Sequence, residues 1–135
     1  MRKLWIILLF SSTFCYGQYK PNWVFIAGLT SAGACHGIDQ TLTFHQYKFN
    51  TKFPGLANKP FWNNQQLWDK TPVILGYRPN AKHIAATGTQ ALCLGSGIVL
   101  VLGKKKKLKH ILYDLVLGGI GYTVGNYITY DLMFR

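Results

Sequence analysis

The stretch HIAATGTQALCLGSGIVLVLGKKKKLKHILYDLVLGGIGYTVGNYITY, from His83 to Tyr130, decides the fold of this chain. Its first arm, residues 84–102, has no charged residue over a length that crosses a hydrocarbon layer of roughly 30 Å as a helix. Its second arm, residues 108–130, carries one lysine, one histidine and one aspartate. A basic turn, residues 103–107, joins the arms. This pattern predicts a hairpin of two transmembrane helices.

The lysines in and beside that turn are candidates for binding anionic lipid headgroups. A long side chain can keep its stem in the apolar layer while the ammonium group reaches a phosphate. The same residues also suit a plain role in setting topology, and their short loop close to the helix ends favours a cytoplasmic turn. The candidates are Lys104, Lys105, Lys106, Lys107 and Lys109.

Composition agrees with a membrane partner. The chain has 135 residues, and 15 Lys and Arg outnumber 4 acidic residues to give a net charge of +11, while 49% of residues are hydrophobic. Long apolar runs beside such a charge favour anionic lipid over nucleic acid as the partner. The three cysteines have no paired spacing, so the sequence predicts no disulfide framework, no zinc motif and no cofactor.

The first residues have the layout of a secretory signal. Two basic residues precede an apolar segment, and small and polar residues follow it. We predict a signal peptide over residues 1–17, with cleavage after Gly17, and a single membrane domain over residues 18–135. An uncleaved anchor is the open alternative.

A third apolar segment, residues 22–38, is rich in small residues and predicts another helix. Gly28 and Ala32 fall on one stripe of that helix, and Gly121 and Gly125 repeat the same spacing in the second arm of the hairpin. Small residues four apart allow helices to approach closely in lipid. We therefore predict that these four residues mediate helix packing, within the chain or between copies. The helix either crosses the membrane or only packs against the hairpin.

Residues 39–83 are predicted to hold the end of that helix and then an interfacial loop. Four of the five prolines fall here, among aromatic and amide side chains. Such large amphipathic rings are typical of the membrane–water interface. Stacking of nucleic-acid bases is a weaker interpretation of the same residues, since the adjacent apolar hairpin already explains them.

Several of these features also occur together in one group of proteins. The end of the signal at Gly17-Gln18, the helix ending at Gly37-Ile38-Asp39, the pattern Phe61-Trp62-Asn63…Trp68-Asp69-Lys70 and the later His83 resemble a family of short uncharacterised exported membrane proteins of Bacteroidota-type bacteria and their phages. The resemblance implies location and architecture, and no activity.

The last residues allow a rival structure. From Ile120 to Phe134 apolar and polar or small residues alternate, which is typical of an outer-membrane strand. Residues 84–102 show no such alternation, so we favour helices and the bacterial inner membrane, and keep the outer membrane as an alternative.

Polar residues inside apolar helices are the candidates for chemistry. His36 and Asp39 end one helix and His83 begins the next, so all three are predicted on the same side, where they could form a metal or acid–base site. No spacing among them is diagnostic. His110 and Asp114, four residues apart, are expected to form a local pair on the lysine side.

The sequence thus predicts an all-α membrane protein with two to three transmembrane helices after an N-terminal signal sequence, and one aromatic-rich interfacial loop. We expect a structural or interaction component of the cell envelope that contacts anionic lipids, copies of itself or other membrane proteins. The alternatives are a membrane-embedded hydrolase acting on lipid or envelope intermediates, and a holin-like pore former. We favour a protein that is not an enzyme.

Overall fold

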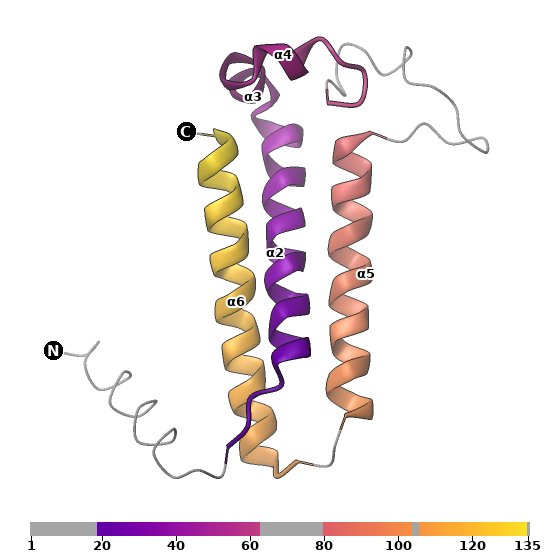
Figure 1. The fold of residues 1–135 in the computed structure, drawn as a ribbon, viewed down its shortest axis with the longest axis vertical. Coiled ribbons are helices and arrows are strands. Elements are labelled where there is room, and N and C mark those ends of the chain that lie inside the picture. Colours follow the sequence, from indigo (N-terminus) through magenta and orange to yellow (C-terminus); the bar gives the residue numbers. More distant parts are fainter. Residues whose placement is uncertain (1–18, 63–79, 104–105, 135) are drawn as a thin grey trace, which may run out of the picture.

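The computed structural model describes residues 19–62, 80–103 and 106–134 (Figure 1). The regular structure within these ranges is helical, so the all-α prediction is confirmed there. The predicted signal peptide and residues 63–79 of the predicted loop lie outside the described residues. The helices are α2 (Trp23–Phe44), α3 (Gln46–Lys52), α4 (Pro54–Ala57), α5 (Ala81–Leu102) and α6 (Leu108–Phe134).

Three long helices lie side by side, and α2 stands between the other two (Figure 1). It packs extensively against both α5 and α6. The two arms of the expected hairpin are therefore joined by the lysine turn, but they pack on α2 instead of on each other. The predicted packing of residues 22–38 against the two arms is thus observed, and α2 lies between them because it offers small residues to both neighbours.

The contact between α2 and α6 is close because glycines line it from both sides. A methyl group added at Gly33 of α2 would run into the backbone carbonyl of Tyr122, and one added at Gly125 of α6 would run into the carbonyl of Thr30. Only the missing side chains allow the two backbones to come this near. Because this seam needs helical spacing, the strand alternative for residues 120–134 is wrong: α6 continues to Phe134.

Two asparagines set where α2 and α5 begin. The side-chain oxygen of Asn22 accepts a hydrogen bond from the backbone N–H of Phe25 at 3.2 Å, and that of Asn80 accepts from the N–H of His83 at 2.9 Å. Each bond satisfies an N–H group that the first helical turn leaves without a partner. The Asn80 cap begins α5 three residues before the predicted 84–102. Similarly, α6 ends four residues after the predicted helix 108–130. α2 begins one residue later and ends six residues later than the predicted helix 22–38.

Two short helices cover one end of the bundle, where the sequence predicted only a helix end and a loop. α3 brings Phe49 against Leu42 of α2 and Ala81 of α5 to form a small buried core. Trp62 stacks on Phe49 with ring centroids 5.5 Å apart. The backbone N–H of Ala81 donates to the carbonyl of Phe61 at 2.8 Å, which ties this cover to the start of α5. We call α3, α4 and residues 58–62 the aromatic end.

Among the described residues, one helix is long and apolar enough to cross a membrane, and it is α5. α2 and α6 have sufficient length, with 22 and 27 residues, but His36, Asp39 and Gln40 make α2 less apolar. In α6, Asp114, Asn126 and several tyrosines have the same effect. Composition therefore supports one of the two hairpin spans.

Candidate functional site

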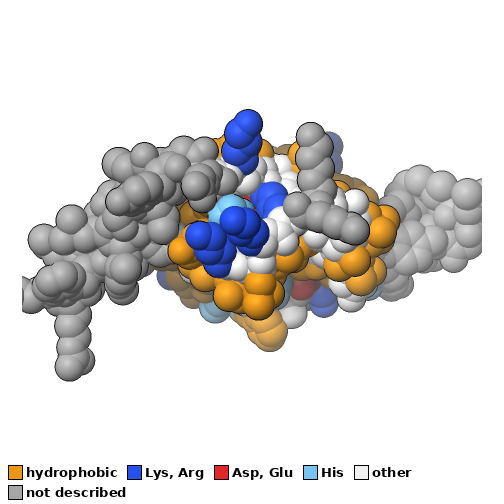
Figure 2. Space-filling model, turned by 90° about the horizontal axis from the view of Figure 1, so that it is seen from below, with side chains coloured by type: hydrophobic (Ala, Val, Ile, Leu, Met, Phe, Trp, Pro, Cys, Tyr) orange, Lys and Arg blue, Asp and Glu red, His pale blue; other side chains and the backbone are white. Residues whose placement is uncertain are grey.

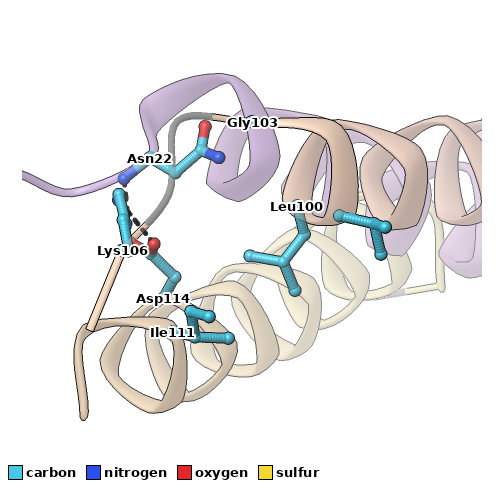
Figure 3. Close-up of a pocket in the computed structure, with 7 residues that line it drawn as sticks. Asn22, Leu100, Gly103, Lys106, Ile111 and Asp114 are labelled. Atoms are coloured by element: carbon cyan, nitrogen blue, oxygen red, sulfur yellow. Dashed lines mark hydrogen bonds and ion pairs between the residues drawn. The ribbon is translucent and has the colours of Figure 1, made fainter. Parts of the chain in front are cut away.

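Asp114 is the centre of the most elaborate polar arrangement that the structure describes. It lies two turns into α6 and is fully buried. Its carboxylate accepts hydrogen bonds from the Tyr19 hydroxyl at 2.7 Å, from the Asn22 backbone N–H at 2.8 Å and from the Lys106 ammonium at 2.6 Å. Figure 3 shows the contacts from Asn22 and Lys106. We call these four residues the Asp114 clamp.

The clamp joins parts of the chain that are distant in sequence. Tyr19 and Asn22 lie within four residues of the start of α2, and Lys106 lies two residues before the start of α6. A carboxylate withdrawn from water is tolerated only when charge and hydrogen bonds compensate it. The three donors supply that compensation, and in doing so they fasten the beginning of α2 to the beginning of α6.

Tyr19 is held in its donating form. Burial raises the pKa of its hydroxyl above the usual range, and the hydrogen bond to the Asp114 carboxylate raises it further. The hydroxyl therefore keeps its proton at any physiological pH and can only donate to the carboxylate. The Tyr19 ring also packs against His110, with centroids 5.5 Å apart. The expected local pair of His110 with Asp114 is therefore wrong. His110 contacts the Tyr19 ring, and the donors to Asp114 all lie outside α6.

The predicted lipid-binding lysines divide into three groups. Lys104 and Lys105 lie outside the described residues. The Lys106 ammonium contacts Asp114 and also donates to the Lys20 carbonyl at 2.9 Å, so it is a structural cation. Lys107 and Lys109 are exposed.

Lys20 is also exposed at this end of the bundle, and sequence reasoning missed it. Its position could have been predicted from the sequence. Lys20 lies just before the small-residue helix, and the beginning of that helix is on the same side of the bundle as the lysine turn. Figure 2 shows Lys and Arg side chains gathered on this end, with hydrophobic side chains around them. We call residues 19–22 and 106–110 the lysine end.

A half-open cleft of about 360 Å³ lies beside the clamp. Asn22, Lys106 and Asp114 form its polar side, and Leu100 and Ile111 belong to its apolar side (Figure 3). The remaining lining residues are Val101 and Gly103. One side of the cleft can contact a polar group, and the other can contact an apolar chain.

The residues predicted for a metal or acid–base site contact different partners. The His36 ring stacks on Tyr122 of α6 at 6.0 Å, and Asp39 accepts from Thr43 on its own helix at 3.2 Å. The His83 ring bonds Asn80 at 2.9 Å. Over the ranges that the structure describes, no three His, Cys, Asp or Glu side chains are arranged to hold a metal ion. The acid–base hypothesis stays a prediction.

The predicted packing residues lie at contacts within the chain. Gly28 faces Ser96 of α5, and the Ala32 carbonyl accepts from the Thr89 hydroxyl of α5 at 3.4 Å. Gly121 and Gly125 both face α2 at Thr30. Sequence reasoning missed their counterparts Gly33, Gly37 and Gly118, although their spacing in the sequence could have revealed the second face of α2.

No protein-family model, curated protein or solved structure matches this chain.

Proposed function

We propose that this chain is a small integral membrane protein, a structural or interaction component of the bacterial cell envelope, which crosses the inner membrane as a bundle of α2, α5 and α6. The observation that carries the proposal is the outward placement of apolar surface. Only 11% of the most apolar part of α5 is buried inside the chain. A core helix of a soluble protein would bury most of that surface.

The other two helices share this pattern. Large apolar side chains on the sides of α2 and α6 are 45% to 67% exposed. A soluble monomer rarely leaves so much contiguous apolar area in water. These side chains include Trp23, Val24, Leu112, Leu115, Val116, Ile120, Val124, Tyr127, Ile128 and Leu132.

Charges fall at the two ends and leave a belt between them. Residues 23–38 of α2, 84–102 of α5 and 115–130 of α6 contain no Lys, Arg, Asp or Glu. The shortest of these stretches corresponds to about 24 Å of helix, close to the thickness of a hydrocarbon layer. Exposed lysines stand beyond the belt at both ends, where water and headgroups would meet them.

Three threonine hydroxyls within the belt are already satisfied. Thr30 donates to the carbonyl four residues earlier at 2.9 Å, Thr89 does so at 2.9 Å and the exposed Thr123 at 3.0 Å. This bond hides a hydroxyl from lipid without a second helix. It explains how α2 and α6 can enter a membrane although their composition is less apolar than that of α5.

Lysine placement supports anionic lipid as a partner. Lys20, Lys107 and Lys109 are exposed on one face at the edge of the belt, where each ammonium group could reach a phosphate. Since Tyr19 lies on that same face, cleavage of a signal after Gly17 outside the membrane would place the lysine end outside too. If the segment before α2 is not carried across the membrane, the lysine end is cytoplasmic instead, and the charge pattern favours this orientation.

The proposal is tested by lysine substitutions at two exposed apolar positions. Val124 in the belt is 46% exposed and Tyr47 at the aromatic end is 66% exposed. If the bundle is in lipid, Val124→Lys should destabilise insertion by roughly 2.5–3.5 kcal/mol and reduce the fraction that resists alkaline carbonate extraction. Tyr47→Lys is the matched control and should stay in the membrane pellet. Release of the wild-type chain by carbonate, or equal tolerance of both lysines, would refute the proposal.

A further inference from the structure

Gln90 is a polar side chain in an unexpected place. It lies about 14 Å from the beginning of α5, near the middle of the helix that, among the described residues, is long and apolar enough to cross a membrane. Its side chain is exposed, and no residue of the described ranges hydrogen-bonds its amide. The neighbouring Thr89 donates to the Ala85 carbonyl. In lipid, an unpaired amide is costly, so Gln90 calls for a polar partner beyond the residues that the structure describes.

The residues that share the face of Gln90 have regular spacing. They alternate three and four residues apart, which is the spacing of a helix–helix seam. Leu94 is 71% exposed and Val101 is 79% exposed, while Ala85 and Ser96, on the side of α2, are buried. The face is therefore directed away from α2. Its members are Thr87, Gln90, Leu94, Gly97 and Val101. We call this set the α5 seam.

The α5 seam contains a hollow. A cleft of about 480 Å³ runs along it between Leu94 and Val101, and every residue that lines it belongs to α5. A methyl group at Gly97 would meet nothing within 4 Å. Glycine in the interior of a helix is less favourable than alanine, and no contact within the described chain requires it here. It leaves the backbone open to the approach of another helix.

Membrane insertion restricts which helix this can be. Two copies inserted in the same orientation are related by a two-fold axis along the membrane normal, so their α5 helices run parallel and each residue meets its own counterpart at the same depth. An amide carries both donors and an acceptor, so two Gln90 side chains can satisfy each other. The two Gly97 hollows then face one another and let the backbones approach.

We propose that the α5 seam is a homodimer interface in which Gln90 of one copy hydrogen-bonds Gln90 of the other and Gly97 permits close contact below them. The proposal rests on the membrane location proposed above, and it names the partner as a second copy of this chain.

The test uses the full chain reconstituted in lipid vesicles and counts copies per complex by single-molecule photobleaching across a dilution series. The wild type should form dimers. Gln90→Leu should raise the dimer dissociation constant by roughly 3- to 20-fold, the range for hydrogen bonds between helices in membranes. Gln90→Asn keeps an amide and should remain close to wild type.

The chain offers a matched control for the hollow. Gly95 is also a glycine of α5 with nothing within 4 Å of an added methyl group, but it lines a different cleft, beside Val24 of α2. Gly97→Val should therefore abolish the dimer, whereas Gly95→Val should leave it intact. The two substitutions change helix propensity equally, so a difference between them reports on the α5 seam.

Each other outcome overturns the dimer. Monomers at all lipid dilutions would mean that lipid alone covers the seam. A dimer indifferent to both Gln90→Leu and Gly97→Val would use another surface. Membrane retention is measured first on the same preparation: a chain in the pellet that is monomeric refutes only the dimer, and a chain released by carbonate refutes both proposals.

Discussion

At the lysine end, one buried carboxylate collects three hydrogen bonds, whereas at the aromatic end Phe49 closes the bundle by packing among other rings. Asp114 accepts hydrogen bonds from the segment before α2 and from the segment before α6. Phe49 has ring contacts with Phe53 at 5.1 Å and Trp62 at 5.5 Å. Both residues are at most 1% exposed.

The difference teaches that the two ends should fail in different ways. The Asp114 clamp depends on the identity of each partner, because a buried charge left without its counter-charge is strongly unfavourable. The packing of Phe49 at the aromatic end depends on volume, because ring contacts carry no charge and set a weaker directional requirement than an ion pair. Substitutions that keep size but remove charge should therefore damage one end only.

The largest expected effect comes from removing the cation of the clamp. Lys106→Met keeps the length of the side chain but leaves Asp114 buried and unpaired, so the free energy of unfolding should fall by about 3–5 kcal/mol. Titration with a denaturing detergent, followed by circular dichroism, measures it. The exposed Lys107→Met is the control and should change little. The double variant Lys106→Met with Asp114→Leu should recover much of the loss; a single variant as stable as wild type would show that the ion pair is unimportant.

Shrinking the core of the aromatic end should have the next largest effect. Phe49→Ala removes a fully buried ring and should destabilise by about 3–4 kcal/mol through lost burial and a cavity. Phe49→Leu should lose less, since it refills part of the volume. The free energy of unfolding is measured by the same detergent titration, repeated at a higher salt concentration. Equal losses for Ala and Leu would argue against packing as the basis of this end.

A smaller effect is expected from one hydroxyl group of the clamp. Tyr19→Phe removes one donor to Asp114 while Lys106 and the Asn22 N–H remain, so the free energy of unfolding should fall by about 1.5–2 kcal/mol. Tyr113→Phe is the matched control, because the Tyr113 ring packs against Tyr19 at 5.4 Å but no bond joins it to Asp114. If Tyr19→Phe loses no more stability than Tyr113→Phe, the hydrogen bond from the Tyr19 hydroxyl to Asp114 does not stabilise the fold.

The smallest effect on stability should come from the exposed lysines. Lys107→Glu with Lys109→Glu should leave the unfolding free energy within about 0.5 kcal/mol of wild type. It should nevertheless weaken enrichment of anionic lipid around the protein by roughly 1 kcal/mol for each lysine lost. Lipid retained after purification in nanodiscs of mixed composition measures this. Lys48→Glu with Lys52→Glu at the aromatic end is the control, and equal losses in both variants would remove the preference for the lysine end.

Local patterns predicted much of this structure. The uninterrupted apolar run before Gly103 and the lysines after it placed the end of α5 at Leu102 and the beginning of α6 at Leu108. Small residues four apart in residues 22–38 predicted a helix, and the structure places that helix at contacts with both neighbours. These features depend on residues close together in sequence.

The clamp could not be predicted in the same way. Tyr19 and Asn22 are more than 90 residues from Asp114, so their meeting depends on α2 lying between α5 and α6. Helical spacing instead suggested His110, which packs on Tyr19. A lone carboxylate in an apolar helix indicated a site, but its partners followed only from the packing of the helices.

The most direct measurement of the membrane account concerns Ile120 on α6, a helix whose composition alone does not establish a span. Ile120 is 51% exposed and lies within the uncharged belt. A nitroxide would be attached at Ile120→Cys, in a chain whose native cysteines are replaced, and its collisions with oxygen and with a water-soluble nickel complex compared in vesicles. Frequent collision with oxygen and protection from nickel are the predicted result. Free access of nickel would place this face in water and contradict the account.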